Sequence, residues 1–487
     1  MTRRAPVATV LYLLLLFCAA AALAQPPGPN EMPSVVQVPE AARAAANFDA
    51  GAATNAYLAQ IPPEKTARSD AYFEGGYWLI LWDFLYGAVV ALLLLNLRWS
   101  AKMRNLAERL CPITPKPGAM GAPETRFKPL QTFAYWVQYL ILVTILTFPL
   151  TVYEDYFREH KYGLATQTFG PWTWDEIKGL GVGLVLGGLL TILLFGIVRR
   201  LQRTWWIWGA VVTFVFLTFV MLIYPVYIVP IFNKVTHLND PKVVDPILRL
   251  ARENGIPAKD VYQIDASRQT TRMSANVSGF AHTMRITLND NLLRRGSPEE
   301  IQAVMGHEMG HYVLNHIYKG LTFGLIVIVV AFAYLRWSLD WSLKRWGEKW
   351  QIRSIGDPAV LPLVAPLGST FFFVLTPVLN TESRATEYQA DLFGLNASRQ
   401  PDGEAQAEIH LAEYRKMEPG PVEEWIFYDH PSGRTRIFAA MRWKAENLQL
   451  FTPPPGKESA PSGSESGHPP AGPGGLTQPS PRAPPKH

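Results

Sequence analysis

Three residues of this 487-residue chain have types and a spacing suited to metal chemistry: His307, Glu308 and His311. Two histidines four residues apart on a helix lie on the same face, one turn apart, so both rings can reach one zinc ion. Glu308 lies beside that ion and can take a proton from an attacking water. The H-E-x-x-H pattern therefore predicts a hydrolytic zinc centre; the alternative is two buried histidines with purely structural hydrogen bonds.

The residues before the motif indicate that it lies on a helix. Ser297 is a favourable N-cap, Pro298 suits the first helical position, and Glu300 completes a capping box with Ser297. We therefore expect a helix that begins near Pro298 and carries both histidines.

A third zinc ligand is predicted in the segment 381–391. Glu387 would complete a site of two histidines and one carboxylate, which leaves the fourth position of a tetrahedral zinc open for water. Asp391 lies one turn further along and would accept a hydrogen bond from the free N–H of a zinc histidine, fixing its tautomer. Taken alone, this segment also fits a solvated acidic helix face. Together with the histidine motif, it predicts one Zn²⁺ per chain.

The composition indicates a membrane protein. Hydrophobic residues make up 48% of the chain and charged residues only 17%, whereas soluble domains are about 25% charged. A membrane span needs about 20 apolar residues, and Trp and Tyr crowd the ends of the apolar runs, as expected at membrane interfaces. Six spans are predicted, at Tyr77–Leu97, Gln131–Tyr153, Gly179–Val198, Trp205–Pro230, Gly320–Leu335 and Leu361–Asn380.

One acidic residue, Asp83, lies inside the first predicted span. An ionisable residue in a span is a candidate functional residue. Because Asp83 is near one end of the span, it also fits a side chain that reaches the interface or faces a wet interior.

The first 24 residues fit a secretory signal peptide. A basic start with Arg3 and Arg4 is followed by an apolar run and by an A-x-A cleavage site before Gln25. The alternative is an uncleaved first span. In both cases residue 25 emerges on the far side of the membrane, which in a bacterium is the periplasm.

The loop charges predict the same orientation. Loops 98–130, 199–204 and 336–360 carry seven, three and five basic residues, whereas loop 154–177 carries two basic and five acidic residues. Basic loops face the cytoplasm, so residues 231–319 and 381–451 lie on the periplasmic side of a bacterial inner membrane. The basic excess, a net charge of +5, lies in short loops beside apolar runs, so nucleic acid is not an expected partner.

The predicted fold is a mostly α, polytopic helical membrane bundle with a zincin-like catalytic domain and a small β element. Its parts are the signal peptide or first span (1–24), a periplasmic segment (25–70), four spans (71–230), a catalytic part with the histidine motif (231–319), two spans (320–380), a second catalytic part (381–451) and a Pro/Gly/Ser-rich tail (452–487). The composition of the tail is typical of disorder.

These motifs resemble those of the type I CAAX prenyl endopeptidases, a family of integral-membrane zinc metalloproteases, and more distantly those of the HtpX proteases. The resemblance covers about residues 70–447. Besides the histidine motif it rests on SRATEYQAD at 383–391, HPSGRTRI at 430–437, EHKYG at 159–163, PIFNK at 230–234 and SANVSG at 274–279.

The resemblance implies a helical ring around a large water-filled chamber, with zinc at its rim. It implies Glu308 as general base, His307, His311 and Glu387 as ligands, His430 as a residue that stabilises the oxyanion, and Arg436 as one that orders the site. Asn276 would lie on a substrate-facing strand.

The predicted activity is that of a metalloendopeptidase acting on peptides or membrane-associated proteins. We expect the substrate backbone to pair with the edge of a strand around Met284–Leu288. Three alternatives stay open: an HtpX-like quality-control protease of the membrane or envelope, a transporter with an incidental H-E-x-x-H, and a structural metal protein without catalysis.

Overall fold

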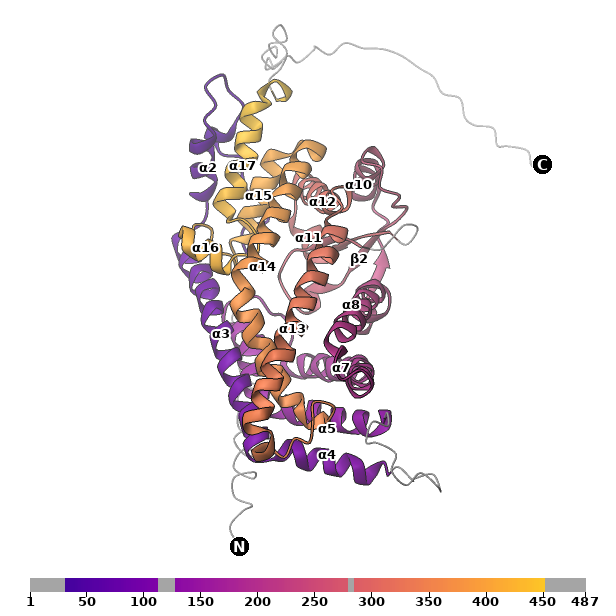
Figure 1. Ribbon diagram of the computed structural model, residues 1–487. Coiled ribbons are helices and arrows are strands. Elements are labelled where there is room, and N and C mark those ends of the chain that lie inside the picture. The colour runs from indigo at the N-terminus through magenta and orange to yellow at the C-terminus, as the bar shows by residue number, and fades with distance from the viewer. Residues whose placement is uncertain (1–30, 113–127, 279–283, 452–487) are drawn as a thin grey trace, which may run out of the picture.

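The computed structural model describes residues 31–112, 128–278 and 284–451 (Figure 1). The predicted signal peptide and the predicted disordered tail lie outside the described residues.

Six helical segments of the described chain are long and apolar enough to cross a membrane, so the six predicted spans are confirmed. They are α3 (Pro63–Asn96), α5 (Pro129–Thr151) with its π-helical continuation η2 (Val152–Arg158) and α6 (Glu159–Lys161), α7 (Phe169–Arg200), α8 (Trp205–Ile223) with η3 (Tyr224–Ile228) and α9 (Val229–Phe232), α13 (His316–Trp350) and α14 (Leu361–Ser398).

The long helices form a closed series of contacts. In order, α3, α5, α7, α8, α13 and α14 each pack against the next, and α14 packs against α3. Helix α4 (Trp99–Leu110) lies against α3 and α5. This arrangement is the ring that the family resemblance implies.

Two of these helices extend well beyond their predicted spans. Helix α13 runs to Trp350 instead of ending near Leu335, and α14 runs to Ser398 instead of Asn380. Hydropathy identifies only the apolar part of a helix. The helix continues past that part when its next turns pack against another element. For α14 that partner is α12 (Pro298–Val313). Glu387 and Asp391 are therefore part of the same helix as a membrane span.

A four-stranded sheet lies beside α12. Its strands are β1 (Val235–His237), β2 (Val261–Ile264), β3 (Ala275–Ser278) and β4 (Arg285–Asn289), in the order β1-β2-β4-β3. Strand β4 pairs in parallel with β2 and antiparallel with β3. The prediction of a free strand edge around Met284–Leu288 is therefore wrong, because both edges of β4 are occupied. The two outer strands of the sheet are β1 and β3, and β3 is the one that contacts α12.

The core beneath the histidine motif joins the sheet to α12. Ile286 and Leu288 of β4 pack with Met305 and Met309 on the face of α12 opposite the histidines, and all four are buried. The capping box predicted for this helix is present, since Ser297 Oγ accepts from the Glu300 amide and Glu300 Oε2 from the Ser297 amide. Burial and capping together hold the motif helix in place.

Further helices surround α12 and the sheet at one end of α3, α13 and α14 in Figure 1. They are α10 (Pro241–Glu253), α11 (Asp290–Arg295), α15 (Pro401–Leu411), α16 (Pro421–Phe427) and α17 (Gly433–Glu446). The segment before α3, with α2 (Ala50–Leu58), packs on α15 and α17 and buries Met32, Val36 and Tyr57.

Candidate metal centre

The two halves of the predicted site meet where α12 and α14 cross with their backbones in contact. A Cβ atom added to Gly394 would lie 2.8 Å from the His307 nitrogen and 3.1 Å from the carbonyl carbon of Gly306. One added to Gly310 would lie 3.1 Å from the Cα of Ala390. Small residues on both helices thus allow the close approach that brings the histidines to the carboxylates.

The structure brings all three predicted metal ligands together. One ligand atom each of His307, His311 and Glu387 lies within 4.8 Å of the others. The two Nε2 atoms are 3.1 Å apart, His307 Nε2 is 3.2 Å from Glu387 Oε2, and His311 Nε2 is 3.6 Å from Glu387 Oε1. Two ligands at about 2.0–2.1 Å from a tetrahedral zinc are about 3.3–3.4 Å apart, so these separations fit such an ion.

The surroundings of Glu387 also favour a cation. Its Oε2 atom is buried without a hydrogen bond, although ring nitrogens of His307 and His430 lie 3.2 and 3.3 Å away. Buried polar atoms are rarely left without a partner. A carboxylate oxygen that nitrogen atoms approach without hydrogen-bond geometry is the arrangement expected around a metal ion.

A buried network holds His307 from behind. Its Nδ1 lies 2.7 Å from Asp391 Oδ1, as predicted for a hydrogen bond that fixes the tautomer. Arg436 donates two hydrogen bonds to Asp391, from Nη2 at 2.6 Å and from Nε at 2.9 Å. Glu404 and Glu408 on α15 also contact the Arg436 guanidinium. Arg436 thus ties α17 to α14 through Asp391, and to α15 through Glu404 and Glu408.

Charge and burial shift the pKa values of the motif residues. Burial of His307 opposes protonation, but the neighbouring Asp391 and Glu387 carboxylates outweigh burial and raise its pKa to about 10. The position of His307 therefore strongly favours a positive charge, whether a proton or a metal ion. Burial also raises the pKa of Glu308, with partial opposition from the two histidines, as suits a general base working near neutral pH.

His430, implied only by resemblance, reaches the same site from the loop before α17. Its Nε2 is 3.3 Å from Glu387 Oε2, and its Nδ1 is 2.9 Å from Asp429 Oδ1. When both ring nitrogens carry a proton, Asp429 accepts from Nδ1 and the second N–H faces Glu387.

Asn276, the predicted substrate-binding residue, lies on the outer strand β3 with an exposed side chain. It lines a cavity of about 640 Å³ together with Ser278 and Thr287. The structure does not bring Asn276 into the ligand set, and its role stays a prediction.

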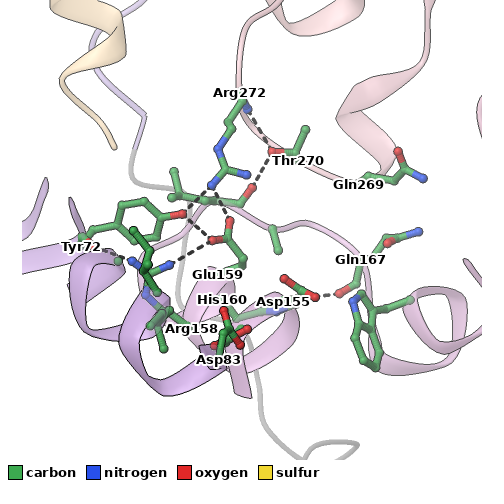
Figure 2. A pocket seen from close by; sticks show the side chains of 17 residues that line it. Tyr72, Asp83, Asp155, Arg158, Glu159, His160, Gln167, Gln269, Thr270 and Arg272 are labelled. Carbon is green, nitrogen blue, oxygen red and sulfur yellow. Dashed lines mark hydrogen bonds and ion pairs between the residues drawn. The ribbon is translucent and has the colours of Figure 1, made fainter. Parts of the chain in front are cut away.

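A second cavity, of about 500 Å³, is lined by Asp83 together with Glu154 and Asp155 (Figure 2). Asp83 therefore lies at the wall of a cavity that two further acidic residues share. Figure 2 also shows Arg272 reaching both Tyr72 and Glu159, with Nη2 donating to each at 2.7 Å. Glu159 begins the EHKYG motif, and Arg272 shortly precedes β3, so this ion pair ties the membrane helices to the outer strand β3.

Sequence reasoning missed several residues of this centre. Glu404, Glu408 and Gly394 stand in no motif that would mark them in the sequence. His316 was also missed, although its place five residues after His311 is a usable signal. Its Nδ1 lies 3.1 Å from His311 Nδ1.

Two family models match the chain. One, described as peptidase family M48, matches residues 237–444, and the other, described as CAAX prenyl protease N-terminal, five membrane helices, matches residues 51–234. The first match includes strands β2, β3 and β4, the three predicted ligand positions, Asp391, His430 and Arg436.

Several known proteins are similar to this chain. It is 30% identical over 314 residues to the uncharacterized metalloprotease YhfN of Bacillus subtilis, covering 64% of this chain and 73% of YhfN. It is 29% identical over 336 residues to CAAX prenyl protease 1 of Saccharomyces cerevisiae, covering 64% and 74%. The crystal structure of S. mikatae Ste24p superposes with a TM-score of 0.64 at 25% identity, covering 78% of this chain and 89% of that one.

Proposed function

Because this chain belongs to peptidase family M48 and is an integral-membrane metalloprotease, we propose that it hydrolyses peptide bonds with one zinc ion held by His307, His311 and Glu387. The observation that carries this proposal is the convergence of these three side chains from two helices onto one point. The comparisons favour neither a transporter with an incidental motif nor an HtpX-like quality-control role.

Each residue has a distinct role in the proposed mechanism. When bound, zinc supplies a Lewis acid that polarises water and the peptide carbonyl. Glu308 takes the proton of the attacking water and returns it to the leaving amine. His430 donates a hydrogen bond to the developing oxyanion, a contribution typically worth about a hundredfold to a thousandfold in rate. Asp391, held by Arg436, keeps the His307 ring in the tautomer whose Nε2 faces the metal.

The substrate proposed for this site is an extended peptide segment. The edge of β3 offers free backbone groups beside α12, and a peptide can pair with such an edge in a sequence-tolerant way. Asn276 and the adjoining cavity then lie along the bound segment. This placement supports an endopeptidase that recognises backbone shape more than one side chain.

Metal removal tests the proposed function. Dialysis of the detergent-purified protein against a strong chelator is expected to reduce cleavage of a quenched fluorescent peptide to background. Stoichiometric zinc is expected to restore it, and magnesium is not, because two imidazoles and a carboxylate suit zinc and magnesium prefers oxygen ligands. Full activity in protein depleted of zinc would contradict the proposal.

We further propose that the active site faces the periplasm of a bacterial inner membrane. The basic loops 98–130, 199–204 and 336–360 support this orientation. β-Lactamase fused after Phe451 is expected to confer ampicillin resistance, whereas the same fusion within the basic loop at Arg203 is not. A resistant Arg203 fusion with a sensitive Phe451 fusion would reverse the orientation.

A further inference from the structure

The two proposed metal-binding histidines differ in the hydrogen-bond partner of the ring nitrogen that faces away from the metal site. His307 directs Nε2 toward the ligand set and Nδ1 toward Asp391, 2.7 Å away. His311 also directs Nε2 toward the ligand set, but its Nδ1 faces no carboxylate among the residues that the structure describes. Its hydrogen-bond partner is the Nδ1 atom of His316, at 3.1 Å. A metal-binding histidine usually donates its second N–H to an acceptor that fixes the ring, so His316 occupies the place of that acceptor.

The chain turns sharply to put His316 there. Helix α12 ends at Val313, and Asn315 adopts a left-handed conformation with φ 59° before α13 begins at His316. Asparagine tolerates this conformation better than most residues. The turn folds the His316 ring back against His311, with ring centroids 5.2 Å apart and planes at 73°. His316 is only 6% exposed, so its ring nitrogens depend on protein partners.

Lys319 determines which ring nitrogens of His316 and His311 carry a proton, because it ends the series of hydrogen bonds that runs through these two rings. Lys319 Nζ lies 3.4 Å from Gln389 Oε1 and can only donate, so the oxygen of the Gln389 amide faces it. The same oxygen lies 3.3 Å from His316 Nε2, which must therefore carry a proton. In a neutral ring this leaves Nδ1 of His316 as an acceptor. His311 then donates from Nδ1 and keeps the Nε2 lone pair free for a metal.

We propose that His316 is a positioning residue for the metal ligand His311, with Gln389 holding His316 in the accepting tautomer. The inference rests on the proposed zinc site and extends it by a relay from Gln389 through His316 to His311. Each metal histidine then has its own support, a carboxylate for His307 and a neutral imidazole for His311. His316 touches neither substrate nor metal and acts through the ring of His311.

Two substitutions separate the hydrogen bond from simple packing. His316→Asn places an amide oxygen at nearly the same distance from the backbone as Nδ1, so it keeps an acceptor for His311. His316→Leu removes the acceptor but fills more of the space. His316→Gln is a further control, because its amide extends toward the position of Nε2 and not of Nδ1.

The readout is the zinc dissociation constant of the metal-free, detergent-purified protein, measured by competition with a chromophoric chelator. We expect His316→Leu and His316→Gln to weaken zinc binding by about 10- to 100-fold, and His316→Asn to stay within about threefold of wild type. A packing role predicts the opposite order, with the smaller asparagine at least as impaired as leucine. Wild-type affinity in His316→Leu, or equal losses in Asn and Leu, would overturn the proposal.

A second variant and the zinc content of the wild-type protein cover the cases in which the His316 variants alone give no answer. If His316→Leu does not fold, as judged by gel filtration and thermal melting, Gln389→Leu decides instead. This change removes the acceptor for His316 Nε2 at an exposed position. We expect it to weaken zinc binding, by less than His316→Leu would. Unchanged zinc affinity would count against the relay. Wild-type protein that binds no zinc would refute the proposed zinc site itself, which is distinct from a failure of the His316 variants alone.

Discussion

Replacing Glu308 by glutamine is expected to abolish peptide hydrolysis while leaving the zinc content unchanged. Glu308 follows His307 on α12 but is not one of the three converging ligands, so the metal site keeps its donors. The amide cannot accept the proton of the attacking water, a role worth about a hundredfold to ten-thousandfold in rate. Cleavage of a quenched fluorescent peptide and zinc analysis of the same sample measure both effects.

Glu299→Gln is the matched control for this prediction. Glu299 lies in the first turn of the same helix with an exposed side chain, so its substitution should change neither activity nor zinc content. Full hydrolysis by Glu308→Gln at one zinc per chain would remove Glu308 from the mechanism.

Replacing Gly394 by valine is expected to remove both zinc and activity, although Gly394 contacts neither metal nor substrate. The added Cβ would lie 2.8 Å from the backbone nitrogen of His307, and backbone atoms cannot move aside as a flexible side chain can. Helices α12 and α14 must separate, at a typical overpacking cost of about 1–3 kcal/mol. Separation moves the histidines away from Glu387, and a misplacement of about 1 Å can cost a hundredfold in rate.

Gly368→Val provides the control on the same helix. A Cβ added to Gly368 meets no atom within 4 Å, so this variant should keep the melting temperature, zinc content and activity of wild type. Equal behaviour of the two variants in these three measurements would show that the α12–α14 contact does not position the metal site.

Much of the site could be predicted because its signals are local. The capping box, the histidine spacing and the apolar runs each depend on residues close in the sequence, and the structure confirms the motif helix and the six spans. Glu387 and Asp391 could be paired with the histidines because two spans must return the chain to the same side of the membrane. The structure places both carboxylates against His307.

The remaining features depend on which elements meet in three dimensions. The period-2 pattern of a strand does not show how many neighbours the strand has, so the edge was predicted around Met284–Leu288, whereas the outer strand beside α12 is β3. A glycine such as Gly394 carries no sign that a second backbone lies against it. In the sequence His316 merely precedes the span predicted at Gly320–Leu335, and only the turn at Asn315 places its ring against His311.

The most direct test of the metal centre is the zinc content per chain of purified wild-type protein and of His307→Ala, measured by elemental analysis after gel filtration. We predict close to one zinc per wild-type chain and close to none in His307→Ala, because that change removes a ligand between Glu387 and Asp391. Wild-type protein without zinc, or His307→Ala with a full zinc complement, would contradict a metal site built from His307, His311 and Glu387.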